Sequence, residues 1–185
     1  MSGKYRTIVA DPPWDLRPGG PASPGSFAVK DGRPGSLPYK AMTLEELSSL
    51  PVKGLAADAA HLYIWTVNAY VEQTYELARA WGFKPSTLLT WAKAPNGLGL
   101  GGTYSLTTEH ILFARRGTCK ALQRIDTTWW LWPRGRHSAK PDAFLDMVEQ
   151  VSPGPRVELF ARRARFGWDY WGNESLGTAE LGSAA

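Results

Sequence analysis

The sequence predicts a single α/β domain in which helices cover both faces of a mainly parallel sheet. Short apolar runs of strand length alternate with segments of helical periodicity, the order that builds a parallel sheet. The chain has 185 residues, enough for one three-layer domain. Apolar residues make up 43% of the sequence and charged residues 21%, which is typical of a globular protein.

The expected strands are short runs rich in β-branched, aromatic and aliphatic side chains. They lie at residues 7–10, 61–66, 87–92, 109–114, 127–132 and 156–161.

Helix signals lie between these runs. Thr43 and Glu46 have capping-box spacing, which predicts a short helix beginning after Thr43. Residues 69–81 carry apolar side chains at helical spacing and end before Gly82, a residue typical of helix C-termini. Pro141 suits the first turn of a helix, and the apolar residues after it give that helix a buried face.

Two segments are predicted to be loops. Residues 15–40 are rich in glycine and proline and lack apolar periodicity, and a loop this long in a small domain is usually functional. We expect it to be a mobile lid that brings Tyr39 to the edge of the substrate pocket. Residues 95–102 form a second glycine-rich loop. The domain is expected to span residues 1–174, followed by a flexible tail over residues 175–185.

Composition limits the classes of site. Cys119 is the only cysteine, so the chain can form neither an intrachain disulfide nor a zinc site with several cysteines. No apolar run approaches the roughly 18 residues of a membrane span, and the N-terminus has no secretion-signal pattern. We therefore expect a cytoplasmic protein with no metal and no membrane association.

The net charge is +4, and the basic residues concentrate after position 114. Three tryptophans, Trp129, Trp130 and Trp132, lie among them. Basic and aromatic residues together favour a nucleic-acid partner. Solvated helix faces and core tryptophans would give the same composition, so this pattern alone leaves both interpretations open.

The candidate catalytic segment is Asp11-Pro12-Pro13-Trp14, directly after the first predicted strand. Ligands of open α/β sheets bind at the edge where such strands end. The two prolines make the segment stiff. The Asp11 carboxylate, the backbone carbonyls and the Trp14 face are then expected to point outward, which suits a flat heterocycle carrying an amine. A rigid turn with a buried Trp14 is the alternative.

The sequence has no HExxH, P-loop or GxSxG pattern, and no early GxGxxG fingerprint for a dinucleotide. Further motifs follow the candidate catalytic segment along the chain. They are Leu37-Pro38-Tyr39, Trp91-Ala92-Lys93, Glu109-His110, His137-Ser138-Ala139-Lys140-Pro141, Glu158-Leu159-Phe160 and Gly172-Asn173-Glu174. In this order they resemble the adenine-N6 methyltransferases typified by the catalytic subunit of the messenger-RNA adenosine methyltransferase, the MT-A-seventy-like family.

The resemblance implies a Rossmann-like methyltransferase fold that uses S-adenosylmethionine, in a permuted order with the catalytic motif before the cofactor-binding strand. It implies methyl transfer to the exocyclic N6 amine of adenine in nucleic acid. Asp11 and the Pro12 carbonyl would accept hydrogen bonds from the amine, with Pro13 between them and the Trp14 ring stacked on the base. Tyr39 would contact the substrate. The implied cofactor-binding residues are Asp11, Lys93, His137, Ser138, Lys140, Arg162, Asn173 and Glu174.

Several alternatives stay open at this point. The small format favours DNA as substrate, with RNA as the alternative, and the protein could act as a homodimer or with a specificity partner. A noncatalytic nucleic-acid-binding scaffold would resemble the family's inactive subunits, but those lack the tetrapeptide that is intact here. Methylation of cytosine or of a protein glutamine is a further alternative. Related enzymes with those substrates usually carry serine or asparagine at the position of Asp11. Lys93 could also be a surface lysine, and Asn173 a turn residue.

Overall fold

The computed structural model describes residues 3–15, 41–94, 103–133 and 139–172. Within these residues seven strands form one sheet, in the order β5-β3-β4-β2-β1-β6-β7. The strands are β1 (Tyr5–Ala10), β2 (Ala56–Thr66), β3 (Lys84–Ala94), β4 (Thr108–Arg116), β5 (Trp129–Pro133), β6 (Arg156–Leu159) and β7 (Asp169–Trp171). All six predicted strands are present, and β7 was not predicted.

The sheet is mainly parallel, as predicted. β1 pairs in parallel with β2 and β6, and the β3–β5 and β6–β7 pairs are also parallel. Within the described part of the chain only β4 is reversed, because it pairs antiparallel with both β2 and β3. Its first residues therefore lie at the edge where β1, β2 and β3 end. We call this the carboxyl edge.

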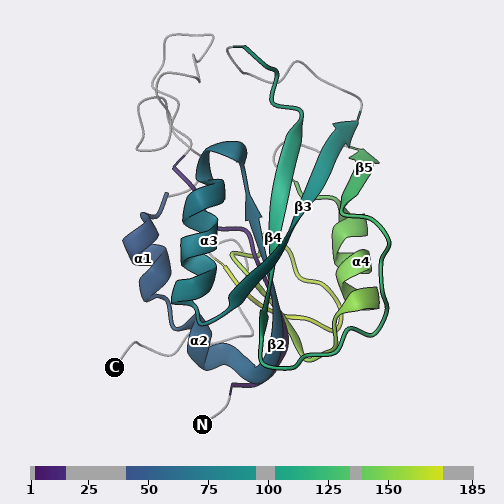
Figure 1. Ribbon diagram of the computed structural model, residues 1–185. Helices are drawn as coiled ribbons and strands as arrows, with labels where there is room; N and C mark the ends of the chain where they lie inside the picture. The colour runs from purple at the N-terminus through teal and green to yellow at the C-terminus, as the bar shows by residue number, and fades with distance from the viewer. Residues whose placement is uncertain (1–2, 16–40, 95–102, 134–138, 173–185) are drawn as a thin grey trace.

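Helices cover both faces of the sheet, which also confirms the prediction (Figure 1). The helical segments are α1 (Leu44–Ser49), α2 (Val52–Leu55), a 3-10 turn (Asn68–Tyr70), α3 (Val71–Ala80) and α4 (Asp142–Val151). Figure 1 shows α1 and α3 on one side of the sheet and α4 on the other. The α3 face and the α4 face are named after these helices.

Local sequence signals begin and end the helices as expected. The Thr43 hydroxyl accepts the Glu46 backbone N–H at 3.1 Å, and the Glu46 carboxylate accepts the Thr43 backbone N–H at 2.7 Å, completing the capping box. Gly82 follows α3 with a φ of 82°, a conformation that costs glycine little. Pro141 is the N-cap of α4 rather than its first residue.

The two faces of the sheet contribute to two separate cores. Along β2, Leu62 and Ile64 belong to the core on the α3 face, while Tyr63 and Trp65 belong to the core on the α4 face. This alternation follows from the two-residue period of a strand. Trp65 therefore sits on the α4 face one residue before β2 ends.

Some predictions fall outside the described residues. These are most of the lid, including Tyr39, the loop at 95–102 and the C-terminal tail. The permuted order depends on where the cofactor binds and stays a prediction. No helix in the described ranges is long and apolar enough to cross a membrane.

Candidate active site

Four charged side chains converge at the carboxyl edge of the sheet. Asp11 follows β1, Lys93 lies near the end of β3, Glu109 lies at the start of β4, and Lys140 directly precedes the N-cap of α4. The parallel strands bring Asp11 and Lys93 to this edge, and the reversed direction of β4 adds Glu109. We call these four residues the Lys140 cluster.

Lys140 is the centre of the cluster. Its Nζ lies 3.1 Å from Asp11 Oδ1 and 3.1 Å from Glu109 Oε2, and Lys93 Nζ lies 2.5 Å from Glu109 Oε1. The Lys140–Glu109 contact has ion-pair distance without full hydrogen-bond geometry. Lys140 Nζ also lies 5.0 Å from the centroid of the Trp65 ring, a favourable place for a cation. The Asp11 carboxylate is thereby fixed in one orientation.

The cluster keeps its central groups charged despite their burial. Burial alone would raise the pKa of Glu109, but the ammonium groups of Lys140 and Lys93 outweigh burial and hold that pKa below its usual value. Burial would likewise lower the pKa of Lys140, and the carboxylates of Asp11 and Glu109 raise it instead. Glu109 and Lys140 are therefore both ionised at neutral pH.

A cavity lies beside the cluster, between the start of α4 and the turn after β6. Asp11 and Lys140 line it together with Glu158, Phe160 and Arg162. Phe160 has a φ of 63°, so the chain turns sharply where β6 ends. The cavity therefore has carboxylates, cations and an aromatic ring on its walls.

Gly172 follows β7 and lies against the turn after β6. A Cβ atom at Gly172 would lie 2.3 Å from the Ala161 carbonyl oxygen, so only glycine fits there. The Ala161 N–H in turn donates to the Trp171 carbonyl at 3.0 Å. The close approach joins the end of β7 to the turn that carries Arg162.

Glu158 is the most perturbed carboxyl group at this site. Burial, with a further contribution from the negative charge of Asp11, raises its pKa to about 7, although Arg163 and Arg165 act in the opposite direction. No residue in the described part of the chain forms a hydrogen bond or ion pair with the Glu158 carboxyl group. A carboxyl group that lines a cavity and has a raised pKa is available to a ligand.

We expect Glu158→Gln to stabilise the protein at high pH. The folded-state pKa lies above the ordinary value of 4.5, so the protonated form favours folding and this contribution is lost as pH rises to about 7 and above. The free energy of unfolding of Glu158→Gln minus that of the parent should therefore be larger at pH 8 than at pH 5. Urea unfolding at both pH values measures this. The exposed Glu45→Gln should show no such rise, and an equal difference at both pH values would contradict the assignment.

Trp14 is buried, which corrects the expectation of an exposed stacking face. Its ring is 4% exposed and stacks on Tyr70 with centroids 4.9 Å apart and an interplanar angle of 22°. Its indole N–H donates to the Trp65 carbonyl at 3.0 Å, and the Tyr70 hydroxyl donates to the Asp15 carbonyl at 2.6 Å. In this structure Trp14 fixes the candidate catalytic segment to β2 and the 3-10 turn.

The backbone carbonyls of the segment also differ from expectation. The Pro12 carbonyl accepts the Trp14 N–H at 2.8 Å, and the Pro13 carbonyl accepts the Met42 N–H at 3.0 Å. The chain turns back on itself after Pro12, so neither oxygen points outward with both lone pairs available. Each retains one lone pair for a further hydrogen bond.

We expect Trp14→Ala to lower the free energy of unfolding by about 3–5 kcal/mol, because it removes a buried ring and one hydrogen bond. Trp129→Ala is the matched control, since the Trp129 side chain is 61% exposed and should cost less than about 1 kcal/mol. Urea unfolding at pH 7 measures both. Equal losses for the two variants would contradict the anchoring role of Trp14.

The structure brings together Asp11, Lys93, Lys140 and Arg162 among the predicted cofactor residues, with Lys93 paired to Glu109. His137, Ser138, Asn173 and Glu174 lie outside the described residues, as does Tyr39. Sequence reasoning gave no role to Glu109 or Glu158, although both belong to motifs that carry the resemblance. The sequence signal that could have indicated a role for both residues is a carboxylate within an otherwise apolar predicted strand.

Comparisons of the sequence with known proteins identify its relatives. A family model described as MT-A70 matches residues 5–174. The Type II methyltransferase M.MunI of Mycoplasma sp is 32% identical over 187 residues, covering 92% of this chain and 78% of that protein. An Arabidopsis thaliana protein named N(6)-adenosine-methyltransferase MT-A70-like is 28% identical over 184 residues, covering 95% of this chain and 24% of that protein.

The human N(6)-adenosine-methyltransferase catalytic subunit METTL3 is 27% identical over 168 residues, covering 86% of this chain and 26% of that protein. The chain thus spans most of M.MunI but only about a quarter of the plant and human relatives. The matched region includes the candidate catalytic segment, the Lys140 cluster and the turn after β6. On this match, and on a mainly parallel sheet with Asp11 at its carboxyl edge, the chain belongs to the MT-A70 family of methyltransferases.

Proposed function

We propose that this protein transfers a methyl group from S-adenosylmethionine to the N6 amine of adenine in DNA. The observation that supports this most strongly is the position of Asp11. Its carboxylate lies at the carboxyl edge of the sheet and lines a cavity. Lys140 holds this carboxylate in one orientation, with Nζ 3.1 Å from Asp11 Oδ1. A fixed hydrogen-bond acceptor at that edge suits a substrate that presents an amine.

The described walls of the cavity beside Asp11 have the chemistry to hold the amino-acid end of S-adenosylmethionine. The amino-acid end of this cofactor carries an ammonium and a carboxylate, and the walls offer carboxylates at Asp11 and Glu158 and cations at Lys140 and Arg162. Phe160 supplies an aromatic surface on the same walls. The resemblance to the family adds further proposed cofactor residues, which are Lys93, His137, Ser138, Asn173 and Glu174. When bound, the cofactor supplies an electrophilic methyl group on its sulfonium.

Asp11 and the Pro12 carbonyl would act on the substrate amine. The lone pair of an adenine amine is delocalised into the ring, so the amine is a weak nucleophile. The Asp11 carboxylate would accept a hydrogen bond from one amine N–H. The Pro12 carbonyl would use its remaining lone pair to accept a hydrogen bond from the other amine N–H. These bonds orient the amine and place a carboxylate next to the proton that the amine must lose.

DNA is the proposed substrate because the relative of similar length is a type II methyltransferase, a class that modifies DNA. The longer relatives are named N(6)-adenosine-methyltransferases, which makes RNA the second candidate. Adenine in a duplex would have to leave the base stack to reach Asp11. Because the Trp14 ring is buried against Tyr70, we do not assign it to stack on the base.

The substrate class is tested with radiolabelled S-adenosylmethionine and separate pools of duplex DNA, single-stranded DNA and RNA. After digestion to nucleosides, we expect label in the DNA pools and little in RNA. Label confined to RNA would contradict the DNA assignment and keep the enzyme assignment. No transfer to any pool, from protein that is folded and binds the cofactor, would contradict both.

We expect S-adenosylmethionine to raise the melting temperature, since a ligand that binds only the folded state stabilises it by RT ln(1 + [L]/Kd). Arg162→Ala should reduce this rise, because it removes a cation from the wall of the cavity. The matched control is Arg79→Ala, on the exposed side of α3. Thermal melts at a fixed cofactor concentration measure the effect. Equal rises in parent, control and Arg162→Ala would exclude Arg162 from the cofactor site.

A further inference from the structure

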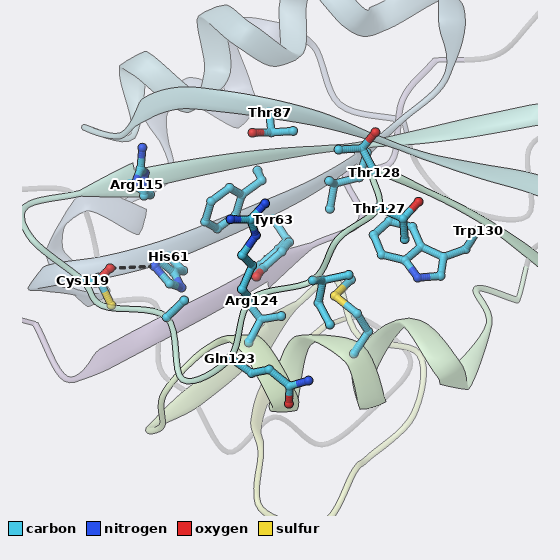
Figure 2. A pocket seen from close by; sticks show the side chains of 16 residues that line it. His61, Tyr63, Thr87, Arg115, Cys119, Gln123, Arg124, Thr127, Thr128 and Trp130 are labelled. Atoms are coloured by element: carbon cyan, nitrogen blue, oxygen red, sulfur yellow. Dashed lines mark hydrogen bonds between the residues drawn. The ribbon is translucent and has the colours of Figure 1, made fainter.

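A second cavity lies on the α4 face, away from the Lys140 cluster. Figure 2 shows it between strands of the sheet, the segment after β4 and helix α4. Its volume is about 310 Å³, within the range of small-molecule sites. None of its lining residues also lines the cavity beside Asp11, and all of them belong to the described part of the chain. We call it the Phe113 pocket.

The inner wall of the Phe113 pocket is apolar and already well ordered. Tyr63 and Phe113 form an aromatic pair with centroids 5.0 Å apart, and Leu89, Met147 and Trp130 extend the surface. Such a wall suits a flat ring system, since ring faces and edges pack against aromatic side chains.

The polar groups deep in the pocket are occupied. Ser152 Oγ lies 2.8 Å from the Tyr63 hydroxyl and 2.8 Å from His61 Nδ1. His61 Nε2 lies 3.1 Å from the Cys119 carbonyl, the contact dashed in Figure 2. Burial raises the pKa of Tyr63 to about 12, so its hydroxyl stays neutral. A ligand body at this depth therefore meets an uncharged surface whose hydrogen bonds are satisfied.

The charged residues that line the pocket are cations. They are Arg115 and Arg124, both exposed, and none of the lining residues is acidic. Arg124 Nε lies 2.9 Å from Asp126 Oδ1, but these side chains are 89% and 86% exposed. Ion pairs this exposed contribute little, so an incoming anion can exchange for Asp126 at small cost.

From this arrangement we propose that the Phe113 pocket is a second ligand site, which binds a small aromatic acid. The ring system lies on Tyr63, Phe113 and Met147, and the acid group meets the guanidinium of Arg124 at the opening. The combination of an apolar interior with a purely cationic set of charges selects an anion over a neutral molecule of the same shape. Because the two cavities share no lining residue, the acid and the methyl donor bind without competing.

The probe is 2-naphthoate, with the neutral 2-naphthamide as its isostere. The chain has three methionines, of which the structure describes Met42 and Met147. Met147 lines the pocket, whereas Met42 packs against the core on the α3 face. With 13C-methyl methionine, NMR titration of the full chain should show a saturable shift at Met147 and none at Met42. Met147→Leu assigns the resonance. The naphthamide should bind about tenfold more weakly, because it lacks the charged hydrogen bond.

Arg124→Ala should weaken naphthoate binding about tenfold and leave naphthamide binding unchanged. Arg124 is exposed, so this variant keeps the fold, and Arg79→Ala is the matched control with parental affinity for both probes. A saturating concentration of S-adenosylmethionine should leave the naphthoate affinity unchanged. Absence of a saturable Met147 shift, equal affinity for acid and amide, or shifts of equal size at Met42 and Met147 would each overturn the proposal.

Discussion

Asp11→Asn is expected to lower the rate of methyl transfer about 100- to 1,000-fold, the typical cost of losing one preorganised electrostatic contact to the reacting group. Asparagine keeps the shape of the side chain but replaces one acceptor oxygen with an N–H donor that faces the amine. It also removes the negative charge that Lys140 holds at 3.1 Å. Single-turnover assays at saturating cofactor separate this loss from weaker binding.

The fold should survive this substitution. The amide oxygen of asparagine can still accept a hydrogen bond from Lys140, and Glu109 still pairs with Lys140, so the free energy of unfolding should fall by only about 1 kcal/mol. Asp126→Asn removes an exposed carboxylate that pairs with Arg124, away from the Lys140 cluster; it is the matched control and should retain the parental rate. A rate within threefold of the parent for Asp11→Asn would remove Asp11 from the reaction.

Lys140→Met should cost both activity and stability. The substitution leaves the carboxylates of Asp11 and Glu109 without the cation between them, with Lys93 as the remaining partner of Glu109. Breaking a largely buried pair in this way costs about 3 kcal/mol of unfolding free energy near neutral pH. Methyl transfer should also fall at least about tenfold, because the Asp11 carboxylate is no longer held toward the cavity.

The stability loss of Lys140→Met should depend on pH. Lys140 helps to hold the pKa of Glu109 below its usual value, so this stabilisation exists above the unfolded pKa of 4.5 and is lost as pH falls through the folded pKa. The difference between parent and variant should therefore shrink in urea unfolding below about pH 4. Lys84→Met, at the start of β3, is the control and should behave like the parent at every pH. A pH-independent loss would show that the lost interaction is packing rather than charge.

The sequence predicted the elements whose signals are local. The apolar run before Asp11 indicated β1, and the capping-box spacing of Thr43 and Glu46 indicated α1. The position of Asp11 at a sheet edge followed from these signals. β2 begins five residues earlier than expected, at Ala56, because a run rich in alanine has no strand preference of its own.

Strand direction and side-chain burial could not be predicted. The apolar run at 109–114 looks the same in either direction, and only its pairing with β2 and β3 places Glu109 beside Lys140. A tryptophan after two prolines can face a ligand or a core. Its partner Tyr70 lies in a distant segment, so burial of Trp14 depended on tertiary structure.

If Asp11 receives the N6 amine of adenine, the chemical identity of the methylated nucleoside should show it. DNA incubated with S-adenosylmethionine and either the parent or Asp11→Asn is digested to nucleosides and analysed by mass spectrometry against standards. We expect N6-methyldeoxyadenosine from the parent and at least about a 100-fold lower yield from Asp11→Asn. N4-methyldeoxycytidine, ring-methylated adenine, or equal yields from both proteins would contradict it.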